Sequence, residues 1–235
     1  MVEICLDAPG KNALGTALME RTRDELRAAA GAPVLLTGAN DAFSAGLNLK
    51  EVTGLDVAGM TRFLELLEDL VSTLFAYPGP TVAAVNGHAI AGGCVLALCC
   101  DHRVIGAEPT LRIGLNEVAL GVPFPPRTLA AVVHRIPPRS RDEILLGAEL
   151  HAPEPALRLG LVDEIAADPV ARGRERLALL AAHPAPAYAA TKLTLRAAAV
   201  APGNAHTRHL HDTIVPAWCA PAVRERLAAA VRPRR

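Results

Sequence analysis

The chain has 235 residues, of which 51% are hydrophobic and only 3% aromatic, and its 24 basic side chains balance 24 acidic ones. A chain of this length buries a substantial core, which alanine, leucine and valine must build because aromatic residues are scarce. The zero net charge argues against a nucleic acid or an anionic membrane as the main partner.

The sequence also carries no signal for a membrane or a secreted location. Its apolar stretches are broken before the roughly 20 residues that a membrane span needs, and the start MVEICLD has acids where a signal peptide has basic residues. The cysteines are Cys5, Cys94, Cys99, Cys100 and Cys219, an odd number with no zinc-site spacing. We therefore expect a cytoplasmic protein with reduced cysteines and no metal.

The first half of the chain alternates short apolar segments with longer helical ones. We expect strands at residues 2–6, 33–37, 81–85, 103–105 and 111–113. One helix is predicted from the common face of Leu14, Leu18, Thr22 and Leu26, and another from that of Phe63, Leu67, Leu70 and Leu74. Residues 94–100 are too apolar for a surface helix. This alternation indicates an α/β fold.

From about residue 127 the chain is expected to be mostly helical. The predicted helices are 128–135, 140–146, 154–159, 170–182, 187–199, 205–214 and 222–230, and prolines separate several of them. A late strand is expected at 161–165.

Two turns rich in small residues follow predicted strands. FSAGLNLK (43–50) comes after the strand at 33–37, and NGHAIAGGC (86–94) comes after the strand at 81–85. Glycine lets a backbone approach a ligand closely. Gly92 and Gly93 at a helix start leave N–H groups pointing outward at the positive end of the helix dipole, which suits an oxyanion. Taken alone, either segment is better explained as an ordinary tight turn.

A single carboxylate, Glu117, lies in the apolar segment GLNEVALG (114–121), and its nearest basic neighbours in sequence are Arg112 and Arg127. Burial without a partner is costly and raises a carboxyl pKa. The alternative is that Glu117 is a surface residue on a short helical turn.

The motifs FSAGLNLKEV, TVAAVNGHAIAGGCVLALCCDHRV and IGLNEVALG occur in this order, and together the sequence resembles the crotonase superfamily of enoyl-CoA hydratases and isomerases. The resemblance implies a spiral of ββα units over residues 1–180. It also implies a C-terminal helical region over 181–235 that builds a trimer or a dimer of trimers. An acyl-CoA thioester is the implied substrate, with coenzyme A as part of it and no separate cofactor.

The resemblance also implies site residues. The N–H groups of Ala45 and Gly92 would form the oxyanion hole, and Glu117 would be the catalytic base in the acyl pocket. Substrate-binding positions would be Ala13, Leu14, Leu47, Asn48, His88, Gly93, Val95, Pro123 and Phe124, and CoA phosphates would be met by Lys11, Lys192 and Arg196. Asp101 is expected to be a structural cap or an ion-pair partner. The first motif departs from the usual Gly-x-Asp-Leu because Asn48 replaces the aspartate.

Val95 separates the reactions within the superfamily. Hydratases carry a second glutamate at this position, whereas valine can neither accept nor donate a hydrogen bond. Moving a double bond needs only one base, and the motifs look most like the Δ3,Δ2-enoyl-CoA isomerases. Hydration, decarboxylation, thioester hydrolysis and a catalytically silent acyl-CoA-binding role remain as alternatives.

Overall fold

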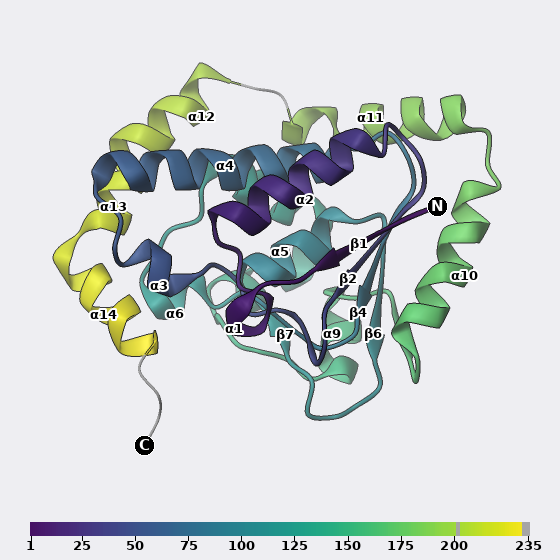
Figure 1. The fold of residues 1–235 in the computed structure, drawn as a ribbon, viewed down its shortest axis with the longest axis horizontal. Helices are drawn as coiled ribbons and strands as arrows, with labels where there is room; N and C mark the ends of the chain where they lie inside the picture. The colour runs from purple at the N-terminus through teal and green to yellow at the C-terminus, as the bar shows by residue number, and fades with distance from the viewer. Residues whose placement is uncertain (201–202, 232–235) are drawn as a thin grey trace.

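The computed structural model describes residues 1–200 and 203–231 and contains two parallel sheets among many helices (Figure 1). The larger sheet has the strand order β1 (Val2–Leu6), β2 (Val34–Gly38), β4 (Thr81–Val85), β6 (His102–Gly106) and β8 (Glu164–Ala166). All neighbours are parallel, with Val2 opposite Val34. The predicted α/β fold is therefore confirmed, and the late strand begins at Glu164 rather than at residue 161.

A second, smaller sheet holds β3 (Ala42–Ser44), β5 (His88–Ile90) and β7 (Ile113–Gly114), again with parallel neighbours. Neither β3 nor β5 was predicted from the sequence. Strands this short offer too few residues for an alternating pattern, and both lie inside segments whose glycines indicate turns.

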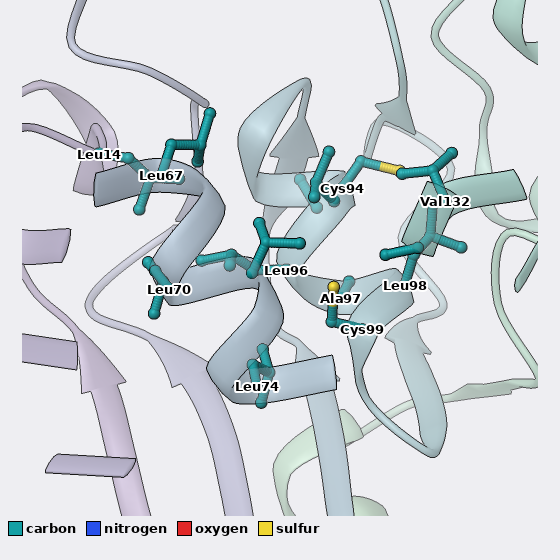
Figure 2. Close-up of a cluster of buried hydrophobic side chains, with 14 of the residues drawn as sticks. Leu14, Leu67, Leu70, Leu74, Cys94, Leu96, Ala97, Leu98, Cys99 and Val132 are labelled. Carbon is teal, nitrogen blue, oxygen red and sulfur yellow. The ribbon is translucent and has the colours of Figure 1, made fainter. Parts of the chain in front are cut away.

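Helices α2 (Thr16–Ala28) and α4 (Val57–Phe75) pack side by side over one face of the larger sheet, with α5 (Gly92–Cys99) beneath them (Figure 1). Every residue of α5 is buried. Figure 2 shows its side chains between Leu70 and Leu74 of α4 on one side and Val132 of α7 (Pro126–Arg135) on the other. The uniformly apolar sequence of α5 follows from this burial on all sides.

The other face of the larger sheet is covered by α10 (Pro169–Ala181). Leu177 of this helix packs against an apolar cluster formed by Leu35, Val82, Ala84 and Val104. Because both faces are covered, the central strands have apolar residues at consecutive positions instead of alternating with polar ones.

The remaining elements connect and flank this core. They are α1 (Pro9–Asn12), α3 (Leu49–Val52), α6 (Glu117–Leu120), a 3-10 turn (Pro138–Ser140), α8 (Arg141–Leu145), α9 (Pro153–Leu159), α11 (Ala185–Val200), α12 (Asn204–His209), a π-helical turn (Leu210–Ile214), α13 (Val215–Cys219) and α14 (Pro221–Val231). The single helix predicted for 205–214 is thus α-helical only in its first part. Among the described residues, no helix combines the length and the apolar character needed to cross a membrane.

The C-terminal helices return to elements from the first half of the chain. Helix α13 packs against α4, while α14 packs against α3 and α6 (Figure 1). Trp218 and Leu227 are almost fully buried by these contacts. These C-terminal helices therefore close over elements that follow β3 and β7 of the small sheet.

Candidate active site

The small sheet brings the three predicted catalytic positions together. Ala45 directly follows β3, Gly92 comes just after β5, and Glu117 comes shortly after β7. Since β3, β5 and β7 are parallel neighbours, their carboxyl ends lie at one edge of the sheet. Ala45, Gly92 and Glu117 all line one cavity at this edge. Parallel strands commonly position reactive groups in this way.

The two glycine-bearing turns touch each other. A side-chain carbon built on Gly46 would lie 3.3 Å from the backbone nitrogen of Gly92, and one built on Gly93 would lie 2.4 Å from the carbonyl oxygen of Ser44. Any larger residue at position 93 would push α5 away from β3. Glycine at this position therefore sets how closely the two turns approach.

The backbone N–H groups of the two turns differ in their partners. Gly92 is the first residue of α5, so its N–H has no acceptor within the helix. The N–H of Ala45 instead donates to the carbonyl oxygen of Lys11 at 2.9 Å. Only one of the two predicted oxyanion donors is thus without a backbone acceptor here, a difference that the sequence did not reveal.

The segment that holds Lys11 is strained and firmly anchored. Gly10, Lys11 and Asn12 have φ angles of 77°, 62° and 58°, and the left-handed region is unfavourable for the two residues with a Cβ. The buried amide of Asn12 donates to the carbonyl oxygens of Ala39 at 2.9 Å and Ala42 at 2.8 Å. These bonds hold the Lys11 carbonyl in place over the small sheet.

Backbone strain also occurs where β5 meets α5. Ala91 has φ 48° and ψ −117°, lines the cavity, and donates its N–H to the Gly114 carbonyl at 2.8 Å. Such backbone angles cost about 1–3 kcal/mol and persist only where neighbouring contacts enforce them. Here the strained residue sets the direction of the Gly92 N–H.

The cavity lined by Ala45, Gly92 and Glu117, called the inner cavity from here on, has a volume of about 220 Å³ and is mostly apolar. Its walls come from the two turns, from α4, α6 and α7, and from the C-terminal helices. The lining residues are Ala45, Leu47, Leu49, Leu67, Ile90, Ala91, Gly92, Val95, Asn116, Glu117, Leu120, Val122, Phe124, Pro125, Thr128, Trp218, Leu227 and Ala230. A cavity of this kind suits an acyl chain with one reactive polar end.

Glu117 is buried in this cavity, with 7% of its surface exposed. Its Oε2 atom has no hydrogen-bond partner among the described residues. Burial raises the pKa of Glu117 to about 8, because the ionised carboxylate loses its hydration. The alternative of a surface glutamate is therefore wrong, and the carboxyl changes its protonation state near neutral pH.

Helix α6, which carries Glu117, ends in a tightly packed turn. Gly121 has φ 77°, and a side-chain carbon there would lie 2.0 Å from Nη1 of Arg226 on α14. Glycine is the residue that ends a helix in this left-handed conformation without cost. The C-terminal helix can therefore pack directly onto the turn behind Glu117.

A second pocket of about 250 Å³ adjoins the inner cavity. The two share Ala45, Leu47 and Leu49, and the outer one adds the predicted residues Ala13 and Asn48. Its other lining residues are Pro9, Gly10, Lys50 and Val231. The predicted donor Ala45 thus lies at the junction between an outer groove and an inner acyl-sized cavity.

Several predicted substrate-binding residues line neither pocket. Leu14 is fully buried in the core beneath Gly92, and Gly93 packs against β3. His88 accepts a hydrogen bond from the backbone N–H of Arg112 at its Nδ1 atom, which ties its ring to the segment before β7. The carbonyl oxygen of Pro123 accepts a hydrogen bond from Trp218 Nε1 at 2.9 Å. These residues support the site from outside the cavity walls.

The prediction that Lys192 and Arg196 meet CoA phosphates is corrected by the structure. Both are buried and pair with Asp101, at 2.8 Å from Lys192 Nζ and 2.7 Å from Arg196 Nη2. Lys192 Nζ also donates to the Gly79 carbonyl at 2.9 Å. Asp101 is the ion-pair partner that the sequence led us to expect. Lys11 remains a candidate phosphate contact, because it is exposed, follows Gly10 of the outer groove and pairs with Asp41, which is exposed as well.

Sequence reasoning missed the wall that the C-terminal helices supply. Trp218, Leu227 and Ala230 line the inner cavity together with Leu67 and Thr128. Trp218 is the only tryptophan of the chain, which was the one signal for an important position. Nothing local in the sequence indicates that α13 and α14 fold back over the small sheet.

Comparison with known proteins agrees with this geometry. The chain matches the family described as enoyl-CoA hydratase/isomerase over residues 1–217. It is 39% identical over 123 residues to mouse mitochondrial enoyl-CoA delta isomerase 1, a match that covers 52% of this chain and 43% of that protein. The chain therefore spans less than half the length of this relative.

Two solved structures share the fold. Human mitochondrial delta3-delta2-enoyl-CoA isomerase has a TM-score of 0.92 at 25% identity, covering 97% of this chain and 92% of that one. A probable enoyl-CoA hydratase from Mycobacterium tuberculosis has a TM-score of 0.80 at 33% identity, covering 91% and 90%. The family match over nearly the whole chain and the arrangement of the small sheet lead to one conclusion: this chain is a member of the enoyl-CoA hydratase/isomerase family and has the crotonase fold.

Proposed function

We propose that the protein is an enoyl-CoA isomerase that moves the double bond of a 3-enoyl-CoA to the 2-position. The observation that carries this proposal is the inner cavity itself. Among the described residues that line it, Glu117 is the one carboxylate, and Val95 occupies the position where a second acid would make a hydratase. One buried base in an apolar cavity matches the needs of a proton shift.

In the proposed reaction the thioester carbonyl lies at the junction of the two pockets, near Ala45 and Gly92. The Glu117 carboxylate takes a proton from C2 of the acyl chain, and the electron pair spreads over the double bond and the thioester oxygen. Glu117 then returns the proton to C4, and the double bond re-forms between C2 and C3. No atom is gained or lost, so the chemistry needs neither water nor a separate cofactor.

The negative charge on the thioester oxygen needs hydrogen-bond donors. The N–H of Gly92 is one donor, supported by the positive end of α5. The second is the N–H of Ala45, which must first exchange the Lys11 carbonyl for the thioester oxygen. The outer groove would hold the pantetheine arm, and Lys11 would meet a phosphate.

Hydration of 2-enoyl-CoA is the second candidate, because a structural relative carries the name of a hydratase. Adding water requires one group to activate the water and another to protonate the α-carbon. Val95 cannot serve either purpose, and it is 1% exposed within the cavity wall. This position favours the isomerase.

The test is to incubate the protein separately with trans-3-enoyl-CoA and trans-2-enoyl-CoA and to separate the products by chromatography with mass detection. An isomerase gives a product of unchanged mass and altered retention. A gain of one water would identify a hydratase, and release of free CoA a thioesterase. A separate incubation with a carboxylated acyl-CoA tests for a decarboxylase, which would release carbon dioxide. A protein that binds both thioesters and changes neither would be a silent binding protein.

We also propose that the protein works as a trimer or a dimer of trimers. Large apolar side chains are exposed on the outer helices, with 58% of Leu179 on α10 and 57% and 63% of Leu193 and Leu195 on α11 open to solvent. Large exposed apolar surface on outer helices is a common property of interfaces between protein chains. Light scattering that finds only monomers at micromolar concentration would contradict this proposal.

A further inference from the structure

We propose that the protein prefers acyl chains of short to medium length, and that the indole of Trp218 sets the limit. This inference rests on the proposed binding of acyl-CoA, and it names the class of acyl chain that the site would take. It arises from the wall that α13 and α14 add to the inner cavity.

The first observation is the direction in which the inner cavity leads away from the outer groove. The junction of the two pockets is formed by Ala45, Leu47 and Leu49, which line both. The large side chains of Leu67 and Trp218 line the inner cavity and not the outer groove. An acyl chain whose thioester lies at the junction would therefore extend toward these side chains.

Helix α14 gives the same direction. Its last residue, Val231, lines the outer groove, whereas Leu227 lines the inner cavity. Trp218 lies before this helix, on α13, which packs against α4 (Figure 1). Because a helix of 11 residues spans about 16 Å, the indole and the end of α14 lie toward opposite ends of the two joined pockets.

The second observation is that the indole is held in place. Trp218 is 2% exposed, and its Nε1 atom donates a hydrogen bond of 2.9 Å to the carbonyl oxygen of Pro123. The acceptor belongs to the segment 123–125, where Pro123 and Pro125 fix the backbone φ angle. Moving the indole aside would leave this carbonyl without its partner, which costs free energy in a buried place. The end wall is therefore rigid.

The size of the cavity turns this wall into a limit on chain length. Its volume of about 220 Å³ lies below the roughly 300–1,000 Å³ of pockets that hold drug-sized ligands. Each methylene group that enters the apolar cavity should tighten binding roughly fourfold. The gain ends when the chain reaches the indole, because a longer chain must displace side chains that are already packed.

The first experiment is calorimetry with saturated, unbranched acyl-CoAs, which have no double bond to move. The series runs from acetyl-CoA through butyryl-, hexanoyl-, octanoyl- and decanoyl-CoA to dodecanoyl-CoA. We expect affinity to rise roughly fourfold per methylene group at the start of the series and to stop rising by decanoyl-CoA. An affinity that still increases from decanoyl- to dodecanoyl-CoA would overturn the inference.

The second experiment uses the fluorescence of the protein. Trp218 is the only tryptophan of the chain, so the tryptophan emission reports on this one side chain. Saturating octanoyl-CoA should change the intensity or the wavelength of the emission, because the end of the chain contacts the indole. Free CoA and acetyl-CoA, which do not reach it, should change the emission much less. An emission that octanoyl-CoA leaves unaltered would contradict the contact.

Variants then assign the limit to the residue. Trp218→Leu shortens the side chain and should move the end of the affinity rise to longer chains, whereas Trp218→Phe keeps a ring and should move it little. Leu210→Ala is the matched control, because Leu210 is a buried residue of the neighbouring π-helical turn outside the cavity lining. It should lower stability and leave the limit unchanged. An unchanged limit in folded Trp218→Leu would contradict the assignment to Trp218.

The same titrations separate this inference from the proposed function. If no acyl-CoA binds, the proposed function fails and the inference fails with it. If acyl-CoAs bind, but their affinity rises through the whole series and the emission of Trp218 stays constant, only the inference about chain length fails. The wild-type series and the fluorescence decide this even if Trp218→Leu does not fold.

Discussion

The backbone N–H of Ala45, a residue that lines both pockets, donates a hydrogen bond of 2.9 Å to the carbonyl oxygen of Lys11. The bond ties the strained segment of Gly10, Lys11 and Asn12 to the turn after β3. If a thioester oxygen takes the place of the Lys11 carbonyl, binding of the acyl group and release of this segment are one event.

We therefore expect the amide resonance of Ala45 to shift when an acyl-CoA binds, since its acceptor changes from a peptide carbonyl to a thioester. Nuclear magnetic resonance of protein labelled with ¹⁵N at alanine measures this directly. Free CoA is the control, because under the proposed function it would fill the outer groove but offers no thioester oxygen, and it should shift Ala45 much less. An Ala45 resonance that stays in place at saturating acyl-CoA would show that this N–H is not an oxyanion donor.

Glu117→Gln should reduce isomerisation of 3-enoyl-CoA by at least about a hundredfold, because general base catalysis is typically worth roughly 10²–10⁴-fold. The amide keeps the shape of the side chain but cannot take the proton. Affinity for CoA thioesters should change little. The free energy of unfolding at neutral pH should hold or rise, since an amide is cheaper to bury than a carboxylate.

Glu68→Gln is the matched control for this variant. Glu68 is a second buried glutamate whose pKa is raised by burial, but it caps α7 instead of lining the cavity. Its replacement should lower stability and leave most of the turnover. Retention of most activity in Glu117→Gln would remove Glu117 as the base and the isomerase proposal with it.

The pH dependence of stability should reveal the buried carboxyl. The pKa of Glu117 rises from 4.5 to about 8 on folding, so the folded state binds this proton more tightly than the unfolded state. The resulting stabilisation is complete below about pH 4.5 and is lost as pH rises toward 8, with a slope of up to about 1.4 kcal/mol per pH unit.

Denaturant unfolding of the wild type and of Glu117→Gln at equal protein concentration measures this contribution, because the variant lacks the titrating group. The difference should grow in favour of the variant between about pH 4.5 and 8. The isomerase rate should rise over the upper part of the same interval as the base ionises. A constant stability difference across these pH values would indicate that Glu117 is not desolvated.

Val95→Glu should give the protein a detectable hydratase activity toward 2-enoyl-CoA. The change places a second carboxylate in the cavity with Glu117, and two acids can share the activation of water and the protonation of the α-carbon. The gain is limited, because two like charges in one apolar cavity raise each other's pKa. Val95→Gln controls for size, since it adds no acid. Efficient hydration by the wild type would contradict our interpretation of Val95.

Lys192 and Lys11 are expected to have separate roles. Lys192→Met removes one of the two cations beside Asp101 and should destabilise the fold. Breaking a buried ion pair costs about 3–5 kcal/mol. Because Arg196 still pairs with Asp101 in this variant, the loss in free energy of unfolding should be about 3 kcal/mol or less. CoA affinity should not change.

Lys11→Met should instead weaken CoA binding a few-fold, as expected for one exposed charge, with little effect on stability. Calorimetry with CoA gives the CoA affinity of each variant, and denaturant unfolding gives the free energy of unfolding of each. A loss of CoA affinity in Lys192→Met with unchanged stability would restore the phosphate contact that the structure contradicts.

Much of this protein could be predicted from the sequence. The long apolar strands and amphipathic helices were predicted because their patterns extend over enough residues to be distinctive, as in β4 and α4. Glu117 was identified because an acid in an apolar segment is costly to bury without a use. The two glycine-bearing turns were identified because glycine permits backbone geometries that few other residues adopt.

The tertiary structure decided how these pieces meet. The strands β3 and β5 are too short to leave a pattern, yet with β7 they bring Ala45, Gly92 and Glu117 to one edge. Lys192 and Arg196 resembled phosphate ligands, but burial beside Asp101 gave them a structural role. Trp218 and Thr128 joined the cavity only because α13 packs on α4 and α7 starts beside it. Each of these outcomes depends on contacts between residues far apart in the chain, and no local pattern of side chains encodes such contacts.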